Sequence, residues 1–121
     1  MNDFFSTACA RWMATVGAVL AAAAIALAAY TSHAVAVGGR QTLFMASMFA
    51  FGHALALTAL PGQVRRRLGL MALGLVGVGC LLFSGSLVAA HFLGWPTRLA
   101  PAGGILMMLG WLVYAVDTAR R

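Results

Sequence analysis

The sequence predicts an all-α membrane protein in which four transmembrane helices form an antiparallel up-down-up-down bundle. Hydrophobic residues make up 63% of the 121-residue chain and charged residues only 8%, whereas soluble domains carry about 25% charged residues. The apolar residues fall into four runs, each close to the ~20 residues that cross a ~30 Å hydrocarbon core. Because backbone groups in lipid must bond within their own segment, each run is expected to be a helix.

The four expected helices belong to one domain, residues 1–121, and short connections join them. They span about residues 12–32, 41–60, 68–93 and 101–118. Pro61 and Gly62 end the second helix, and Pro101 suits the first turn of the fourth, where its missing N–H costs no hydrogen bond. Short connections make neighbouring helices antiparallel. A cleaved signal peptide is the competing interpretation of the first run, but that run is longer than a usual signal-peptide core.

All cations of the chain are arginines, and they lie beside the ends of the apolar runs. This placement is typical of membrane boundaries, so the net charge of +6 does not indicate nucleic-acid binding. One face of the membrane is expected to hold Arg11, Arg65, Arg66, Arg67, Arg120 and Arg121. Arg40 and Arg98 fall on the opposite face, so the positive-inside rule predicts that both termini are cytoplasmic. Residues 65–67 could also dock a partner.

Polar residues gather at the outer ends of the expected helices, and this cluster is the best candidate for a binding site. It contains His33, Ser84, Ser86, Gly103 and Gly104. His33 and His91 could ligate a haem axially, but the helix ends offer no enclosed pocket, so no metal and no cofactor are expected. Asp3 and Asp117 are placed outside the apolar runs, and acid–base catalysis therefore has no support; we do not expect an enzyme.

His53 is the deepest ionisable residue of the chain. It lies about 18 Å from the outer end of the second helix if the count starts at Gln41. An unpaired imidazole in hydrocarbon costs several kcal/mol, on the order of an unsatisfied polar group. His53 is therefore expected to point into the bundle and to form a hydrogen bond with another helix. Tyr114 of the fourth helix falls at the same depth and is the expected partner.

Small residues predict where the helices touch. Gly17, Ala18, Ala21 and Ala22 form small-xxx-small pairs on the first helix, and such pairs let helix backbones approach closely in lipid. On the third and fourth helices the expected packing residues are Gly85, Gly103, Gly104 and Gly110. The first three are expected at the contact between these two helices, where Ser84 or Ser86 would bond a backbone carbonyl.

Four short strings carry a resemblance to a known family. They are SHAV at 32–35, HALAL at 53–57, FSGSL at 83–87, and APAGG at 100–104 followed by GW at 110–111. In this order, over nearly the whole chain, they resemble the YgdD-like family of small bacterial inner-membrane proteins, domain of unknown function 423. The resemblance implies a four-helix inner-membrane protein and brings no established activity. Val88 and Ala100 stand where the family usually has Tyr and Thr, which implies that any polar site is depleted here.

Two functional hypotheses follow from these observations. In the first, the protein is a non-enzymatic structural or accessory subunit that acts by helix association in the lipid bilayer, as a homo-oligomer or within a larger membrane complex. In the second, it is a small oligomeric transporter or channel, with Ser84, Ser86 and His53 along the path. A dry bundle packed on glycine favours the first hypothesis, and a polar seam filled with water favours the second.

Overall fold

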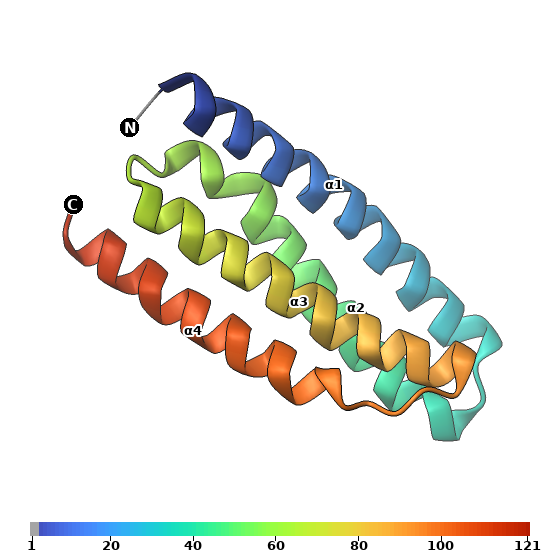
Figure 1. Ribbon diagram of the computed structural model, residues 1–121. Helices are drawn as coiled ribbons and strands as arrows, with labels where there is room; N and C mark the ends of the chain where they lie inside the picture. The colour runs from blue at the N-terminus through green and yellow to red at the C-terminus, as the bar shows by residue number, and fades with distance from the viewer. Residues whose placement is uncertain (1–2) are drawn as a thin grey trace.

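The computed structural model describes residues 3–121 and contains four long helices joined by short connections (Figure 1). The elements are α1 (Asp3–Ala34), α2 (Val37–Ala59), the 3-10 helix η1 (Pro61–Gln63), α3 (Arg67–Leu93) and α4 (Leu99–Ala119). Each of the four α-helices is long and apolar enough to cross a membrane. The predicted fold class, an all-α membrane protein with four spanning helices, is confirmed.

The largest difference from the expected helix boundaries is at the start of α1. This helix has 32 residues and begins at Asp3 instead of near Trp12. Its first turns continue past the apolar run because they lie over η1, which gives them a packing partner. α3 ends at Leu93, and Gly94 follows it as the C-cap. The φ of Gly94 is 66°, a left-handed conformation that glycine adopts without strain.

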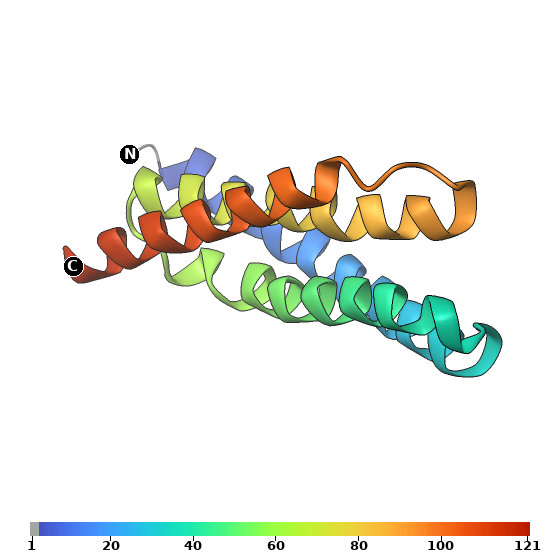
Figure 2. The same ribbon diagram turned by 90° about the horizontal axis from the view of Figure 1, so that it is seen from below.

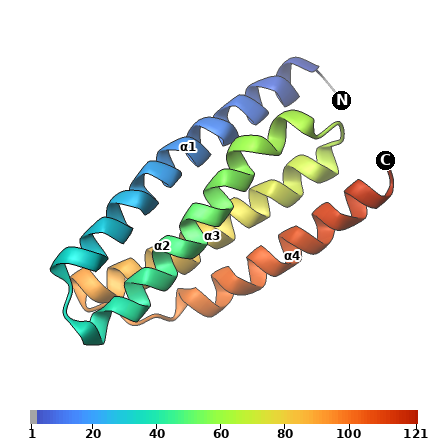
Figure 3. The same cartoon turned by 180° about the vertical axis from the view of Figure 1, so that it is seen from behind.

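The helices are arranged as two hairpins that stack on each other. Among residues 3–121, α1 packs mainly on α2, and α4 packs on α3, while α2 and α3 join the two hairpins. In Figure 2 the two hairpins form separate layers at the end away from the termini, whereas near the termini α1 lies at the level of α3. Figures 1 and 3 show α1 and α4 on opposite flanks of the molecule. Successive helices run in opposite directions. Because α1 and α4 do not touch, the outer face of each is left for lipid or for another chain.

Both described ends of the chain lie at one end of the molecule, beside the turn between α2 and α3 (Figure 1). Two hydrogen bonds tie the C-terminus to this turn: the Arg66 guanidinium donates to the Arg120 carbonyl at 3.1 Å, and Arg121 donates to the Gln63 carbonyl at 3.4 Å. Arg11 lies at the same end, against the turn. The six arginines that the sequence groups together therefore share one end of the molecule, which we call the arginine-rich end.

Apolar side chains cover the outside of the molecule as well as its interior. Ile25, Met71 and Leu112 are exposed on three different helices, as expected of surfaces that face lipid. The centre of the bundle is filled by fully buried residues such as Leu73 and Val76 of α3. α3 is the most buried of the four spans, because it contacts all three of the other long helices.

Candidate functional site

His53 forms a hydrogen bond between helices, but its partner is not the residue that the sequence suggests. The Trp111 indole Nε1 donates to His53 Nε2 at 3.2 Å, and His53 Nδ1 lies 2.7 Å from the carbonyl oxygen of Phe49, one turn earlier on α2. Since Nε2 accepts, the proton is assigned to Nδ1, which donates to the carbonyl. The imidazole is then neutral and both of its nitrogens are satisfied.

The expected pair of His53 and Tyr114 is wrong. The connection from α3 to α4 folds back along the molecule, so α4 begins deeper than α2 does (Figure 2). The same number of residues from the start of each helix therefore does not reach the same depth. The residue of α4 that is level with His53 is Trp111, one turn before Tyr114. Tyr114 instead packs edge-on against Trp111, with ring centroids 5.9 Å apart.

A buried acid, Asp117, lies further along the same helix and was missed by the sequence analysis. Its side chain is 0% exposed. Arg121 donates to Asp117 Oδ2 from Nη2 at 3.0 Å and from Nε at 3.3 Å, and this hydrogen bond raises the pKa of the Arg121 guanidinium. Asp117 therefore does not sit outside the bundle as expected, because it faces α3 from within α4.

The surroundings of Asp117 explain how a carboxylate is accommodated there. A Cβ added at Gly69 would lie 2.7 Å from Asp117 Oδ2, so the carboxylate rests against the first turn of α3. Helix N-termini carry partial positive charge, which favours an anion at this place. The other carboxylate oxygen, Oδ1, is buried without a hydrogen-bond partner among residues 3–121. The Arg121 guanidinium also lies 5.8 Å from the Tyr114 ring centroid. Asp117, which packs against Gly69, and Arg121, which donates to the Gln63 carbonyl, thus fasten the end of α4 to the bundle.

The glycines expected at helix contacts separate into two groups. Gly103 and Gly110 lie where α4 crosses α3 at backbone distance: a Cβ at Gly103 would be 2.5 Å from the Phe83 nitrogen, and one at Gly110 would be 2.8 Å from the Val76 nitrogen. Gly85 and Gly104, by contrast, have nothing within 4 Å of the place of a Cβ. The prediction that Gly85 and Gly104 form the α3–α4 contact is wrong, because both project from the outer sides of their helices.

Ser84 provides a direct tie between two helices. Its hydroxyl donates to the Ala46 carbonyl of α2 at 2.9 Å. A serine that bonds a backbone carbonyl was expected, although the carbonyl belongs to α2 and not to α4. Cys80, one turn earlier on α3, donates to the Phe49 carbonyl at 3.7 Å. Ser84, Cys80 and His53 therefore all bond carbonyl oxygens of α2.

The predicted polar cluster at the outer end does not form an enclosed site. Ser84 and Ser86 are buried, whereas His33 is exposed at the end of α1. Gly103 is buried against Phe83, and Gly104 meets open space. His91 packs edge-on against Tyr30, with ring centroids 6.4 Å apart. These residues occupy separate local environments, so the buried serines act in packing and His33 stands alone at the surface.

No group of three or more metal-binding side chains occurs among residues 3–121. The interior polar groups hold helices together: the Trp111–His53 bond joins α4 to α2, and the Ser84 and Cys80 bonds join α3 to α2. Such bonds between membrane helices contribute about 0.6 kcal/mol each on average. They add specificity to a bundle whose closest contacts are made by glycine.

Four apolar helices with a glycine-packed interior define a small multi-pass α-helical membrane protein. A family model described as "Protein of unknown function (DUF423)" matches residues 26–104, and the chain belongs to this family. The match runs from the second half of α1 to the first turns of α4. It includes His53, Ser84 and Gly103. No solved structure matches the chain.

Proposed function

We propose that the protein is a non-enzymatic subunit of the plasma membrane that acts by helix association. The observation that carries this proposal is the outer face of α1. The exposed small residues on this face are Ala18, Ala22, Ala26 and Ala29. They recur at intervals of three or four residues and therefore form one stripe along the helix. The opposite side of α1, with Gly17 and Ala24, is buried within the chain.

The two sides of α1 use small residues in different ways. At Gly17 the helix touches α2 at backbone distance, since a Cβ there would lie 2.8 Å from the Ala54 carbonyl oxygen. The alanine stripe has no such partner among residues 3–121, although it has the same kind of surface. Small residues let helices pack closely in lipid, where apolar burial alone gives no driving force between helices. A second copy of this chain or a helix of a larger complex fits this stripe.

The alternative, a small transporter or channel, needs a polar path through the bundle. Ser84, Cys80 and His53 instead direct their hydrogens to carbonyl oxygens of α2. At the α3–α4 contact, the added Cβ at Gly79 would lie 2.7 Å from the carbonyl oxygen of Gly103. Backbones at this separation leave no room for water between the two helices. These features support the association hypothesis.

A substitution in the stripe tests the association. Ala22→Ile adds bulk to the exposed face of α1, and Ala115→Ile adds the same bulk to an exposed position of α4. The association is measured by energy transfer between donor- and acceptor-labelled copies in proteoliposomes. Ala22→Ile is expected to weaken the apparent affinity between copies about tenfold, which corresponds to ~1.4 kcal/mol. Ala115→Ile should leave it unchanged. Equal energy transfer in both variants would rule out the α1 face as the interface.

The orientation is part of the same proposal. Six arginines at the arginine-rich end, against Arg40 and Arg98 at the other, support a cytoplasmic position for both termini. A fluorescent protein fused after Arg121 is expected to be bright, because it folds in the cytoplasm. Alkaline phosphatase at the same place is expected to be inactive. An active phosphatase fusion would reverse the orientation.

A further inference from the structure

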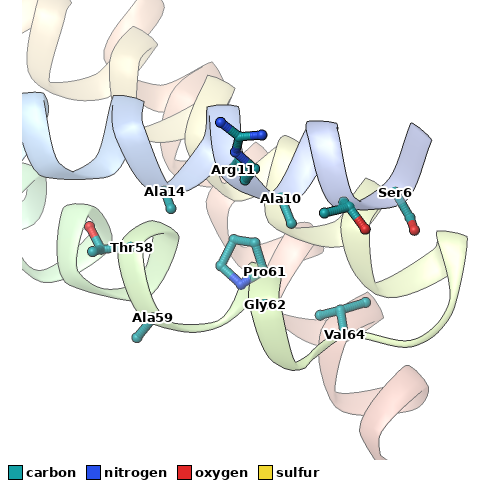
Figure 4. A pocket seen from close by; sticks show the side chains of 10 residues that line it. Ser6, Ala10, Arg11, Ala14, Thr58, Ala59, Pro61, Gly62 and Val64 are labelled. Carbon is teal, nitrogen blue, oxygen red and sulfur yellow. The ribbon is translucent and has the colours of Figure 1, made fainter. Parts of the chain in front are cut away.

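A cavity lies between α1 and the turn that follows α2, at the arginine-rich end (Figure 4). α1 and α2 touch at Gly17. From there α1 continues toward Asp3 for roughly 21 Å, at a rise of about 1.5 Å per residue. α2 ends much sooner, at Ala59, where Pro61 and Gly62 turn the chain. The overhang of α1 above this turn leaves a partly open cavity of about 320 Å³. This volume is within the range of ligand-binding pockets, ~300–1,000 Å³.

The charge of the cavity selects an anion. Arg11 is the one charged residue in the lining, and Figure 4 shows it on α1 with its guanidinium turned away from Pro61, at the rim of the cavity. Its side chain is exposed, so it is free to turn toward an anion at the mouth of the cavity. The ion pair found among residues 3–121 joins Asp117 to Arg121, so it does not neutralise Arg11. The next cations along the turn are residues 65–67, which carry the same sign. A guanidinium presents its donors in a planar fork that matches two oxygens of a phosphate group.

The hydroxyl groups of the cavity define the rest of the ligand. Ser6 and Thr7 donate to the Asp3 carbonyl at 3.0 and 2.7 Å, and Thr58 donates to the Ala54 carbonyl at 2.8 Å. Each of these hydroxyls already donates its hydrogen to a backbone carbonyl, so its oxygen can only accept a hydrogen bond from a ligand in the cavity. A ligand that fills the cavity must therefore bring its own hydrogen-bond donors in addition to its negative charge.

We propose that this cavity binds a phosphate group that carries hydroxyls, with Arg11 on the phosphate and Ser6, Thr7 and Thr58 accepting from the hydroxyls. Glycerol phosphate has this chemistry, either as the headgroup of a phosphatidylglycerol-type lipid or as a free anion. The lipid is favoured by position, because the cavity lies where α2 ends, at the level at which headgroups meet the hydrocarbon. Anionic headgroups are also attracted to arginines at a membrane surface. This inference does not depend on the association of α1.

The test is a titration of the purified full-length protein, in a zwitterionic detergent, followed by native mass spectrometry. The ligands are short-chain phosphatidylglycerol, short-chain phosphatidylcholine and glycerol 3-phosphate. The wild type is expected to bind phosphatidylglycerol at one site at least tenfold more tightly than phosphatidylcholine. Arg11→Gln should weaken phosphatidylglycerol binding about tenfold. Arg65→Gln is the matched control, since it removes an arginine from the same end but outside the cavity lining.

A second variant separates the cavity from the general effect of charge. Ala14→Leu keeps every arginine and places a larger side chain in the cavity lining, so it should also weaken phosphatidylglycerol binding. Thermal unfolding of Arg11→Gln and Ala14→Leu should match the wild type. Equal losses in Arg11→Gln and Arg65→Gln, or unchanged binding in Ala14→Leu, would overturn the site. Binding of glycerol 3-phosphate without phosphatidylglycerol would overturn the lipid source.

Discussion

Gly103→Val is expected to destabilise the bundle by about 3 kcal/mol or more, because the added side chain has no space at the α3–α4 contact. A Cβ at this position would lie 2.5 Å from the Phe83 nitrogen and 2.6 Å from the Gly79 carbonyl oxygen. Both are backbone atoms of α3, which cannot move aside as a flexible side chain can. The helices must separate, and the contacts around them are then lost.

The neighbouring glycine provides the control for this substitution. Gly104 has nothing within 4 Å of its would-be Cβ, so Gly104→Val makes the same chemical change one residue further on α4 without a clash. The measurement is the unfolding free energy in mixed micelles, titrated with a denaturing detergent and followed by far-ultraviolet circular dichroism. The described packing of α4 on α3 would be wrong if the two variants unfolded at the same midpoint.

Gly17→Val is expected to separate α1 from the rest of the molecule while α2, α3 and α4 stay together. The added Cβ would lie 2.8 Å from both the Ala54 carbonyl oxygen and the Thr58 nitrogen, which are backbone atoms of α2. α1 has only slight contact with α3, so its place in the molecule depends on its contact with α2 and with η1. Overpacking of this kind typically costs about 1–3 kcal/mol.

The separation can be measured by pulsed electron paramagnetic resonance between spin labels on α1 and α2. In Gly17→Val the distance distribution should broaden and shift to longer values, and in Gly52→Val it should stay as in the wild type. Gly52 also lies on a helix, and a Cβ there would meet nothing within 4 Å. A narrow, unshifted distribution in Gly17→Val would contradict the proposed role of this contact.

The number and type of helices could be predicted from the sequence because the length of an apolar run depends on the chain alone. Which glycines lie at the helix contacts could not be predicted, because this depends on which side of each helix faces the bundle. Gly103 and Gly104 differ by about 100° around the helix axis, so only one of them can face α3. In a helix that is apolar on all sides, hydrophobicity does not reveal this side.

A signal for the buried side of α4 was nevertheless present in the sequence. Gly103, Gly110 and Asp117 follow one another at intervals of seven residues, a spacing that keeps side chains on one side of a helix. All three are buried against α3. Because Asp117 continues the seven-residue spacing of the two glycines, the sequence indicates that Asp117 faces the bundle. The partner of His53 was a different kind of problem, since the depth of Trp111 depends on how the α3–α4 connection folds.

We propose that this protein works in association with other helices through the outer face of α1. The most direct test is native mass spectrometry of the wild-type protein, released from membranes in mild detergent or in lipid nanodiscs. We expect masses of two or more copies, or of one copy bound to another membrane protein, and a loss of these species in Ala22→Ile. A single copy at every concentration, with lipid alone bound to it, would show that α1 is not an association surface.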